Sequence, residues 1–254
     1  MKKLRFGTAD ISKGHLILVN PSHPIKHDIQ QKELTSLHPY AEHILLERQT
    51  AKMLLSVMHF LDCKHEIVPV SGYRSIDEQQ KIYADSLQKN GKSFTKKFVA
   101  IPGCSEHQTG LAVDLAKNSK EIDFIRPEFP YTGIYGYFRE ISVRYGFIER
   151  YPANREKITK IAHEPWHFRY VGYPHSEIMK DKCFTLEEYT IYLKQFCYQK
   201  NHLRFRNHRG DFEIFYVPVQ ANKDIFVEIP EGMPYQISGN NIDGVVLTLW
   251  RERL

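Results

Sequence analysis

Two short segments carry polar side chains that packing alone does not explain. The first, GCSEHQTGLAVDLA (103–116), places His107 and Asp114 in a run whose second half is apolar and reads as a buried strand. A carboxylate among apolar neighbours is costly to bury unless something compensates its charge. Arg74 could do this through an ion pair, and a metal ion is the other candidate. The segment itself leaves that choice open.

The second segment, HEPWHF (163–168), adds two histidines and a glutamate. Together, His107, Asp114 and His167 form the ligand set of a catalytic zinc, which leaves a fourth position for water. Zinc can lower the pKa of bound water to about 7, so hydroxide becomes available at neutral pH. The ion would also neutralise Asp114. His163 lies beside this motif and could compete with His167.

Hydrolysis also needs a base and a stabiliser of the charge that develops on the carbonyl oxygen. Glu164 lies three residues before His167, so we expect its carboxylate to reach the metal-activated water and later to protonate the departing amine. Arg74, in SGYRS (71–75), is the predicted cation beside the oxyanion, where one good donor contributes about 3–4 kcal/mol. Cys104 is not needed as a nucleophile, since activated water supplies it.

Local patterns predict the elements that position these residues. Helices are expected over 42–61, from the Ser75/Glu78 capping box to Asn90–Gly91, up to Tyr145 before Gly146, and over 185–196. Strands are expected over 66–75 and 158–172, where Pro165 indicates an edge or a bulge. Four short strands follow in a β-rich tail: 212–219, 224–230, 234–238 and 244–250.

Length and composition indicate one large domain with a small annex. The 254 residues carry a formal net charge of +5 without a dense basic stripe, so we expect no nucleic-acid partner. The four cysteines are scattered and no 18-residue apolar run occurs. With no signal peptide visible, these features predict a cytoplasmic protein that is not inserted in a membrane.

Three separated motifs resemble one enzyme family. S-x-H-x-x-G-x-x-x-D at 105–114, SGYRS at 71–75 and E-P-W-H at 164–167 are similar to the zinc D-Ala-D-Ala peptidases, which include the VanX and VanY enzymes of vancomycin resistance. The similarity spans roughly 19–196 and is greatest to the VanXY type, a combined D,D-dipeptidase and D,D-carboxypeptidase. Residues beyond about 200 depart from the family pattern, because the short VanXY proteins end near the last helix.

The resemblance implies roles for individual residues. It implies that His107, Asp114 and His167 bind one Zn²⁺ ion, with the second histidine taken as the one that follows Trp. Glu164 would be the catalytic base and Arg74 the group that polarises the carbonyl. Further residues match positions that contact substrate or line the pocket, namely Ser105, Gln79 and Trp166. Each of these three also has an ordinary structural reading, as a turn, a helix surface and a core residue.

The resemblance further implies a fold and an activity. The expected fold is α+β, a mostly antiparallel sheet flanked by helices, with a catalytic domain over 1–200 and a small β-rich domain of unknown role over 201–254. The expected substrates are the free D-Ala-D-Ala dipeptide and the terminal D-Ala of UDP-muramyl-pentapeptide, whose removal contributes to vancomycin resistance. The annex could cover the site, recognise a precursor or support a homodimer.

Two alternatives remain at this point. One is a cell-wall L,D-carboxypeptidase or endopeptidase on the same scaffold, which would normally need export. The other is a non-catalytic zinc-binding module like the hedgehog-like relatives of the fold, which predicts missing base or ligand positions. All of these positions are filled in this sequence.

Overall fold

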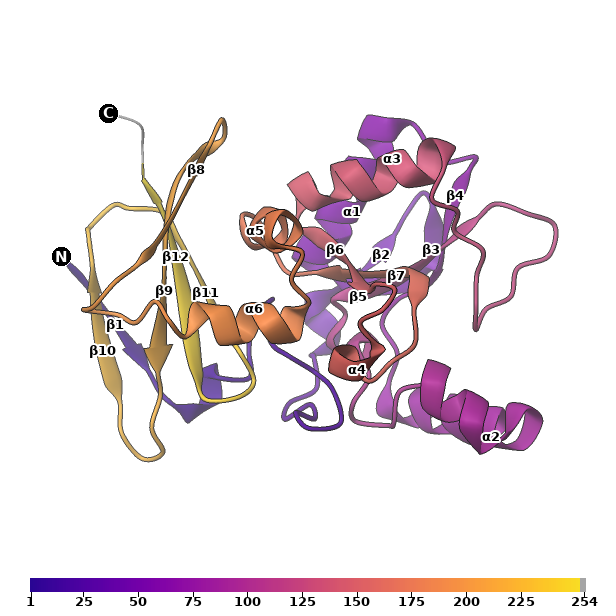
Figure 1. The fold of residues 1–254 in the computed structure, drawn as a ribbon, viewed down its shortest axis with the longest axis horizontal. Helices are drawn as coiled ribbons and strands as arrows, with labels where there is room; N and C mark the ends of the chain where they lie inside the picture. The colour runs from indigo at the N-terminus through magenta and orange to yellow at the C-terminus, as the bar shows by residue number, and fades with distance from the viewer. Residues whose placement is uncertain (252–254) are drawn as a thin grey trace. The chain divides into compact units, whose positions relative to one another are not determined.

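The computed structural model describes residues 1–251 and folds the chain into two compact units (Figure 1). One unit runs from Val19 to Thr185. The other combines the first 18 residues with the chain from Leu186 onward. The expected boundary near residue 200 therefore differs from the boundaries of these two units, which fall at 18/19 and 185/186. Residues 252–254 of the expected annex lie outside the described part of the chain.

A four-stranded sheet forms the centre of the unit over 19–185. All of its neighbouring strands are antiparallel. Its order is β4 (Ile67–Ser71), β5 (Ala112–Lys117), β7 (Glu164–Tyr170) and β6 (Phe147–Tyr151). The hairpin of β2 (Leu34–Leu37) and β3 (Ala41–Glu47) is separate. The expected α+β class with a mainly antiparallel sheet is confirmed.

Helices surround this sheet, and α1 packs against α3 in Figure 1. They are α1 (Arg48–Leu61), α2 (Ile76–Phe98), α3 (Gly133–Ser142), α4 (Glu156–Thr159) and α5 (His175–Lys182), with the short 3-10 turns η2 (Gln31–Glu33), η3 (Glu106–Thr109) and η4 (Val143–Tyr145). Among residues 1–251, no helix combines the length and the apolar composition needed to cross a bilayer.

Alternation along β7 separates an apolar face from a polar one. Phe168 packs against Phe129 and Phe138, with ring centroids 5.4 and 5.1 Å away. Because successive side chains of a strand point to opposite faces, His167 is directed to the other face. The core on the α3 side therefore fixes which face of the sheet carries the candidate site.

The predicted helix over 42–61 is wrong for its first turns, which form β3. The residues of β3 pair with β2, with Leu34 opposite Glu47. The Glu47 carboxylate then accepts hydrogen bonds from the backbone N–H groups of Gln49 and Thr50, at 2.9 and 2.8 Å. This cap satisfies two of the N–H groups left open at a helix start, so the helix begins at Arg48.

The next helix begins as predicted and continues further. Ser75 and Glu78 form the expected reciprocal capping box of α2. Gly91 interrupts the helix with φ 79°, but the chain resumes helical geometry as far as Phe98. Pro165 was expected at an edge or a bulge; β7 is an inner strand, and a register shift lies opposite it between Glu149 and Tyr151.

The second unit is rich in strands, as expected for the tail. Its elements are β1 (Lys2–Phe6), η1 (Thr8–Asp10), α6 (Leu186–Leu193), β8 (Leu203–Asn207), β9 (Gly210–Pro218), β10 (Ile225–Ile229), β11 (Tyr235–Gly239) and β12 (Gly244–Arg251). One sheet has the order β11-β12-β9-β8, and β1 pairs with β10. The sequence did not predict β1, whose partner lies more than two hundred positions away.

We expect Leu54→Ala to lower the free energy of unfolding by about 2–5 kcal/mol, because it leaves a cavity in a closely packed core. Leu54 lies on α1 and is fully buried. Phe60 on the same helix is 58% exposed, so Phe60→Ala should cost less than about 1 kcal/mol. Denaturant unfolding followed by circular dichroism compares the two. Equal losses would contradict the packing described for α1.

Candidate metal and catalytic site

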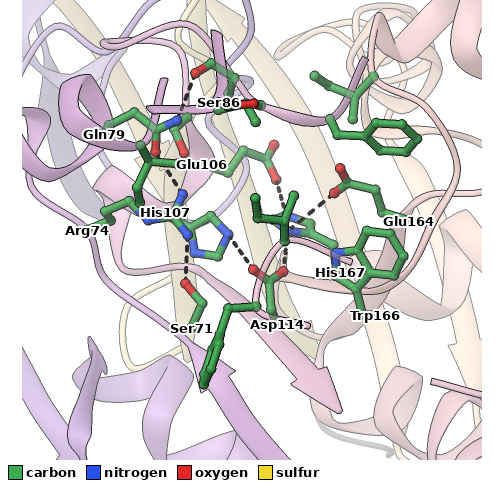
Figure 2. Close-up of a pocket in the computed structure, with 18 of the residues that line it drawn as sticks. Ser71, Arg74, Gln79, Ser86, Glu106, His107, Asp114, Glu164, Trp166 and His167 are labelled. Atoms are coloured by element: carbon green, nitrogen blue, oxygen red, sulfur yellow. Dashed lines mark hydrogen bonds and ion pairs between the residues drawn. The ribbon is translucent and has the colours of Figure 1, made fainter. Parts of the chain in front are cut away.

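Strand register brings two of the predicted metal ligands together. Asp114 on β5 lies directly opposite His167 on β7. The turn η3, just before β5, supplies His107. Ligand atoms of these three buried residues all lie within 4.8 Å of one another, and Figure 2 shows their side chains converging. Residues separated by up to 60 positions in sequence therefore form a single cluster.

The hydrogen bonds define which ring nitrogen of each histidine faces the cluster. Nδ1 of His107 lies 2.7 Å from the carbonyl oxygen of Gly72, which can only accept, so this nitrogen carries a proton. Its Nε2 lies 3.1 Å from Oδ2 of Asp114. His167 faces the other oxygen of Asp114 through Nδ1, at 2.9 Å. One carboxylate thus lies between two imidazole nitrogens.

This donor set fits a divalent cation of the zinc type. Two imidazole nitrogens and one carboxylate oxygen are ligands that zinc accepts, and they leave a coordination position open. Burial alone would raise the pKa of Asp114, but His107 and His167 hold it well below its ordinary value. Asp114 is therefore ionised near neutral pH. Its direct partners are the two imidazoles, and the described ion pairs include none between Asp114 and Arg74.

Glu164 lies beside the cluster without being one of its three members. Its Oε2 is 3.9 Å from Nδ1 of His167. Burial and the charge of Asp114 raise the pKa of Glu164 to about 8, although His167 and Arg74 oppose the rise. A carboxyl group with a pKa in this range can exchange protons near neutral pH, as acid–base catalysis requires.

Arg74 is fixed by hydrogen bonds on one side of the same cavity. Its Nη1 donates to Oε1 of Gln79 and its Nη2 to the hydroxyl of Ser71, both at 2.8 Å. Gln79 also donates through Nε2 to the carbonyl oxygen of Ala100, at 2.8 Å. Both polar atoms of the Gln79 amide are therefore engaged, one by Arg74 and the other by the backbone of Ala100. A substrate contact for Gln79 stays a prediction.

A glycine permits the close approach of the segment before Arg74 to its neighbours. A Cβ atom at Gly72 would lie 2.4 Å from the backbone oxygen of Leu45. The same stretch of backbone hydrogen-bonds to η3, since the Arg74 N–H donates to the carbonyl oxygen of His107 at 3.2 Å. The glycine of SGYRS thus lets one backbone position both His107 and Arg74.

A cavity of about 370 Å³ opens onto the cluster. Ser105 and Trp166 line it, at 2% and 7% exposure. The Ser105 side chain makes no capping hydrogen bond to η3, although a local turn was its ordinary structural reading. The outer wall comes from α2 and includes Ile82, Asp85 and Lys89. A volume of this size is typical of a small-ligand site.

His163, the competing histidine, lies outside the cluster. Its Nε2 is 2.7 Å from the hydroxyl of Tyr131 and 3.5 Å from Oε1 of Glu149. The structure therefore separates the two histidines of HEPWHF, and His167 is the one that joins His107 and Asp114.

Sequence reasoning missed one group of charged residues at the site. Glu106 is fully buried with two arginines, Arg150 and Arg169, at 2.8 Å from each. Burial alone would raise the pKa of Glu106, but the two guanidinium groups hold it well below its ordinary value. Glu106 lies inside the first motif, between Ser105 and His107. A charged residue at this position, for which the motif assigns no role, is the feature of the sequence that could have revealed the cluster.

Comparison with known proteins shows the family to which a chain with this site belongs. Residues 43–173 match the family model of VanY, D-alanyl-D-alanine carboxypeptidase. The bifunctional D-Ala-D-Ala dipeptidase and D-Ala-D-Ala carboxypeptidase VanXYC of Enterococcus gallinarum is 42% identical over 182 residues, which cover 71% of this chain and 95% of that protein. The chain belongs to the VanY family.

Solved structures extend the comparison of this VanY-family chain. The vancomycin resistance D,D-dipeptidase VanXYg, in complex with a D-Ala-D-Ala phosphinate analog, matches with a TM-score of 0.95 and 48% identity, covering 98% of this chain and 99% of that one. The strand-rich C-terminal part is therefore shared with that structure. The expectation that residues beyond about 200 depart from the family pattern therefore holds only in comparison with shorter relatives such as VanXYC.

Two further structures resemble the VanY-family chain over about two thirds of its length. A D,D-pentapeptidase VanY from a VanB-type resistance cassette, in complex with Zn(II), has a TM-score of 0.58 and 30% identity, covering 69% of this chain and 98% of that one. The LD-carboxypeptidase LdcB has a TM-score of 0.59 and 34% identity, and the match covers 68% of this chain and 84% of that one.

We expect His167→Ala to abolish tight zinc binding and His163→Ala to preserve it, because only His167 converges with His107 and Asp114. Removing one of three protein ligands leaves two, which hold the ion far less firmly. Metal content after dialysis, measured by atomic absorption, distinguishes the two variants. Loss of zinc from the His163 variant alone would contradict the assignment of ligands.

Proposed function

We propose that this chain is a zinc-dependent D,D-peptidase that hydrolyses D-Ala-D-Ala and removes the terminal D-Ala of UDP-muramyl-pentapeptide. The observation that carries this proposal is the convergence of His107, Asp114 and His167 beside Glu164 in one cavity of a VanY-family fold. Membership of the family and the similarity to VanXYC and VanXYg support the D,D-specificity.

In this proposal His107, Asp114 and His167 hold a single zinc ion. A bound zinc ion supplies Lewis acidity, which activates water and polarises the scissile carbonyl group. The preset nitrogens of His107 and His167 and the ionised Asp114 provide the ligand atoms. These ligand atoms all lie within 4.8 Å of one another, so the three side chains can face one ion.

The acid–base chemistry then belongs to Glu164. Its carboxylate takes the proton of the attacking water and delivers it to the departing D-Ala amine. Arg74, held by Ser71 and Gln79, presents a fixed positive charge where the carbonyl oxygen becomes negative. Because Arg74 is already oriented, it does not have to reorganise during the reaction. Ser105 and Trp166 are proposed to contact the substrate from the cavity wall.

A cytoplasmic location is part of the proposal. Within residues 1–251 the four cysteines are all free, and no helix is suited to crossing a bilayer. Free thiols are typical of a reducing compartment. Removal of D-Ala termini from soluble precursors there would contribute to vancomycin resistance by depleting the target of the antibiotic.

The L,D-carboxypeptidase alternative has weaker support. LdcB matches with a TM-score of 0.59, against 0.95 for VanXYg. A non-catalytic module is disfavoured because the base, the cation and all three ligands are present in one cavity. Turnover of D-Ala-D-Ala, a D-Ala-terminated pentapeptide and an L,D-linked tetrapeptide, measured side by side, discriminates these functions.

We expect Glu164→Ala to bind zinc like the wild type while turnover of D-Ala-D-Ala falls by about 100-fold or more, because proton transfer loses its base. Glu128 offers a control, since it is an exposed acidic residue paired with Lys117 at the surface. Glu128→Ala should keep both properties. Released D-Ala and bound zinc are the two measurements. Retained turnover in the Glu164 variant would falsify the mechanism.

We also expect kcat/KM to rise with pH along an acidic limb, because Glu164 acts as a base only when ionised. Burial raises its pKa to about 8, and a nearby divalent cation lowers it again by favouring the carboxylate. The midpoint should therefore lie above the ordinary value of 4.5 and below about 8. Rates from about pH 5 to about pH 9, with zinc content checked at each pH, test this. A rate that falls across this range contradicts it.

A further inference from the structure

The buried carboxylate of Glu106 divides its two oxygen atoms between different partners. Nε of Arg150 and Nη1 of Arg169 both lie 2.8 Å from Oε1. The other oxygen, Oε2, lies 3.7 Å from Nε2 of His167. Figure 2 shows this carboxylate directed at the His167 ring, on the side away from Asp114.

The two facing atoms are otherwise unsatisfied. Oε2 of Glu106 and Nε2 of His167 are both buried, and neither has a hydrogen-bond partner within residues 1–251. Buried polar atoms without partners are rare, and each calls for an explanation. A proton on Nε2 would be directed at Oε2 of Glu106, which lies just beyond hydrogen-bonding distance at 3.7 Å.

Strand geometry places the supporting arginines. Arg169 is two residues beyond His167 on β7 and shares its face. Arg150 belongs to β6, inside the register shift between Glu149 and Tyr151. Side chains from two strands therefore converge on Glu106. Buried ion pairs add little stability relative to apolar side chains of similar size, so stability alone does not explain this cluster.

We propose that Glu106, fixed by Arg150 and Arg169, is a positioning residue that holds His167 with its proton on Nε2 and its Nδ1 lone pair directed at the cation. Histidines that bind metals usually donate their other N–H to such a partner, which fixes the ring and its tautomer. The counterpart for His107 is the carbonyl oxygen of Gly72. This inference rests on the proposed zinc-dependent function.

The first test uses the wild-type protein loaded with zinc. Two-bond ¹H–¹⁵N correlation spectra of the imidazoles report which nitrogen carries the proton. We expect the proton of His167 on Nε2, and metal coordination through Nδ1. Coordination through Nε2 would overturn the proposal, because Glu106 could not then receive a proton from the ring. This measurement does not depend on any variant folding.

The second test is the zinc affinity of Glu106→Gln. The two arginines should bind the amide oxygen, which turns the NH₂ donor toward the Nε2 proton and opposes the metal-binding tautomer. We expect zinc affinity, measured by competition with a chromophoric chelator, to fall by about 10–100-fold. Unchanged affinity in the folded variant would overturn the proposal.

Glu213 offers a matched control in the other compact unit. It too is a buried carboxylate with a histidine and two arginines as partners: His202, Arg204 and Arg251. Its arginines are more exposed than those of Glu106, but Glu213→Gln also removes the negative charge from a carboxylate–arginine–histidine cluster, and it should leave zinc affinity unchanged. An equal loss in both variants would show a general effect of breaking a buried cluster and would count against a specific role for Glu106.

A third variant addresses the risk that Glu106→Gln leaves two buried arginines uncompensated and unfolds. Glu106→Leu with Arg150→Met and Arg169→Met replaces the whole cluster by apolar side chains, a change that buried ion pairs often tolerate. We expect cooperative unfolding to persist while zinc affinity falls. A folded triple variant with wild-type zinc affinity would overturn the inference.

The two proposals fail in different ways. A wild-type protein that neither binds zinc nor releases D-Ala would contradict the proposed function. A wild-type protein that does both, with the Nε2 tautomer absent or the variants unimpaired in zinc binding, would contradict only the role of Glu106.

Discussion

The structure depends on one buried carboxylate held between two imidazole rings. Asp114 lies in the middle of a strand with apolar neighbours, at 6% exposure, and it is ionised. The cost of burying this charge is offset because His107 and His167 each face one oxygen atom of the carboxylate. That arrangement requires antiparallel pairing of β5 with β7 in one register, since a shift of one residue would move His167 to the other face.

The charged residues around Asp114 differ in their partners, and these partners determine what each residue can do. Glu164 is buried close to Asp114, which raises its pKa and suits it to proton transfer. Arg74 is held by Ser71 and Gln79, and no carboxylate of residues 1–251 forms an ion pair with it, so its charge is available to the cavity that it lines. Glu106 has its charge compensated by two arginines, which leaves one oxygen directed at His167. Each acidic group thus has a different environment and a different chemistry.

Local sequence signals were reliable where short-range interactions decide the structure. The Ser75/Glu78 capping box opens α2, Gly146 ends the helical segment before it with φ 93°, and the four C-terminal strands form near their predicted bounds. They failed where distant partners decide. Residues 42–47 belong to a strand because they pair with β2, and β1 is a strand because it pairs with β10.

The sequence by itself determined the residue types of the site and their family: two histidines, an aspartate, a glutamate and an arginine in motifs typical of zinc D-Ala-D-Ala peptidases. Only the tertiary structure decided which nitrogen of each ring faces Asp114, that His163 is bonded elsewhere, and that Gln79 is occupied with Arg74. It alone revealed the cluster of Glu106. The physical reason is that ring orientation and charge compensation depend on groups brought together by strand register, which no short motif contains.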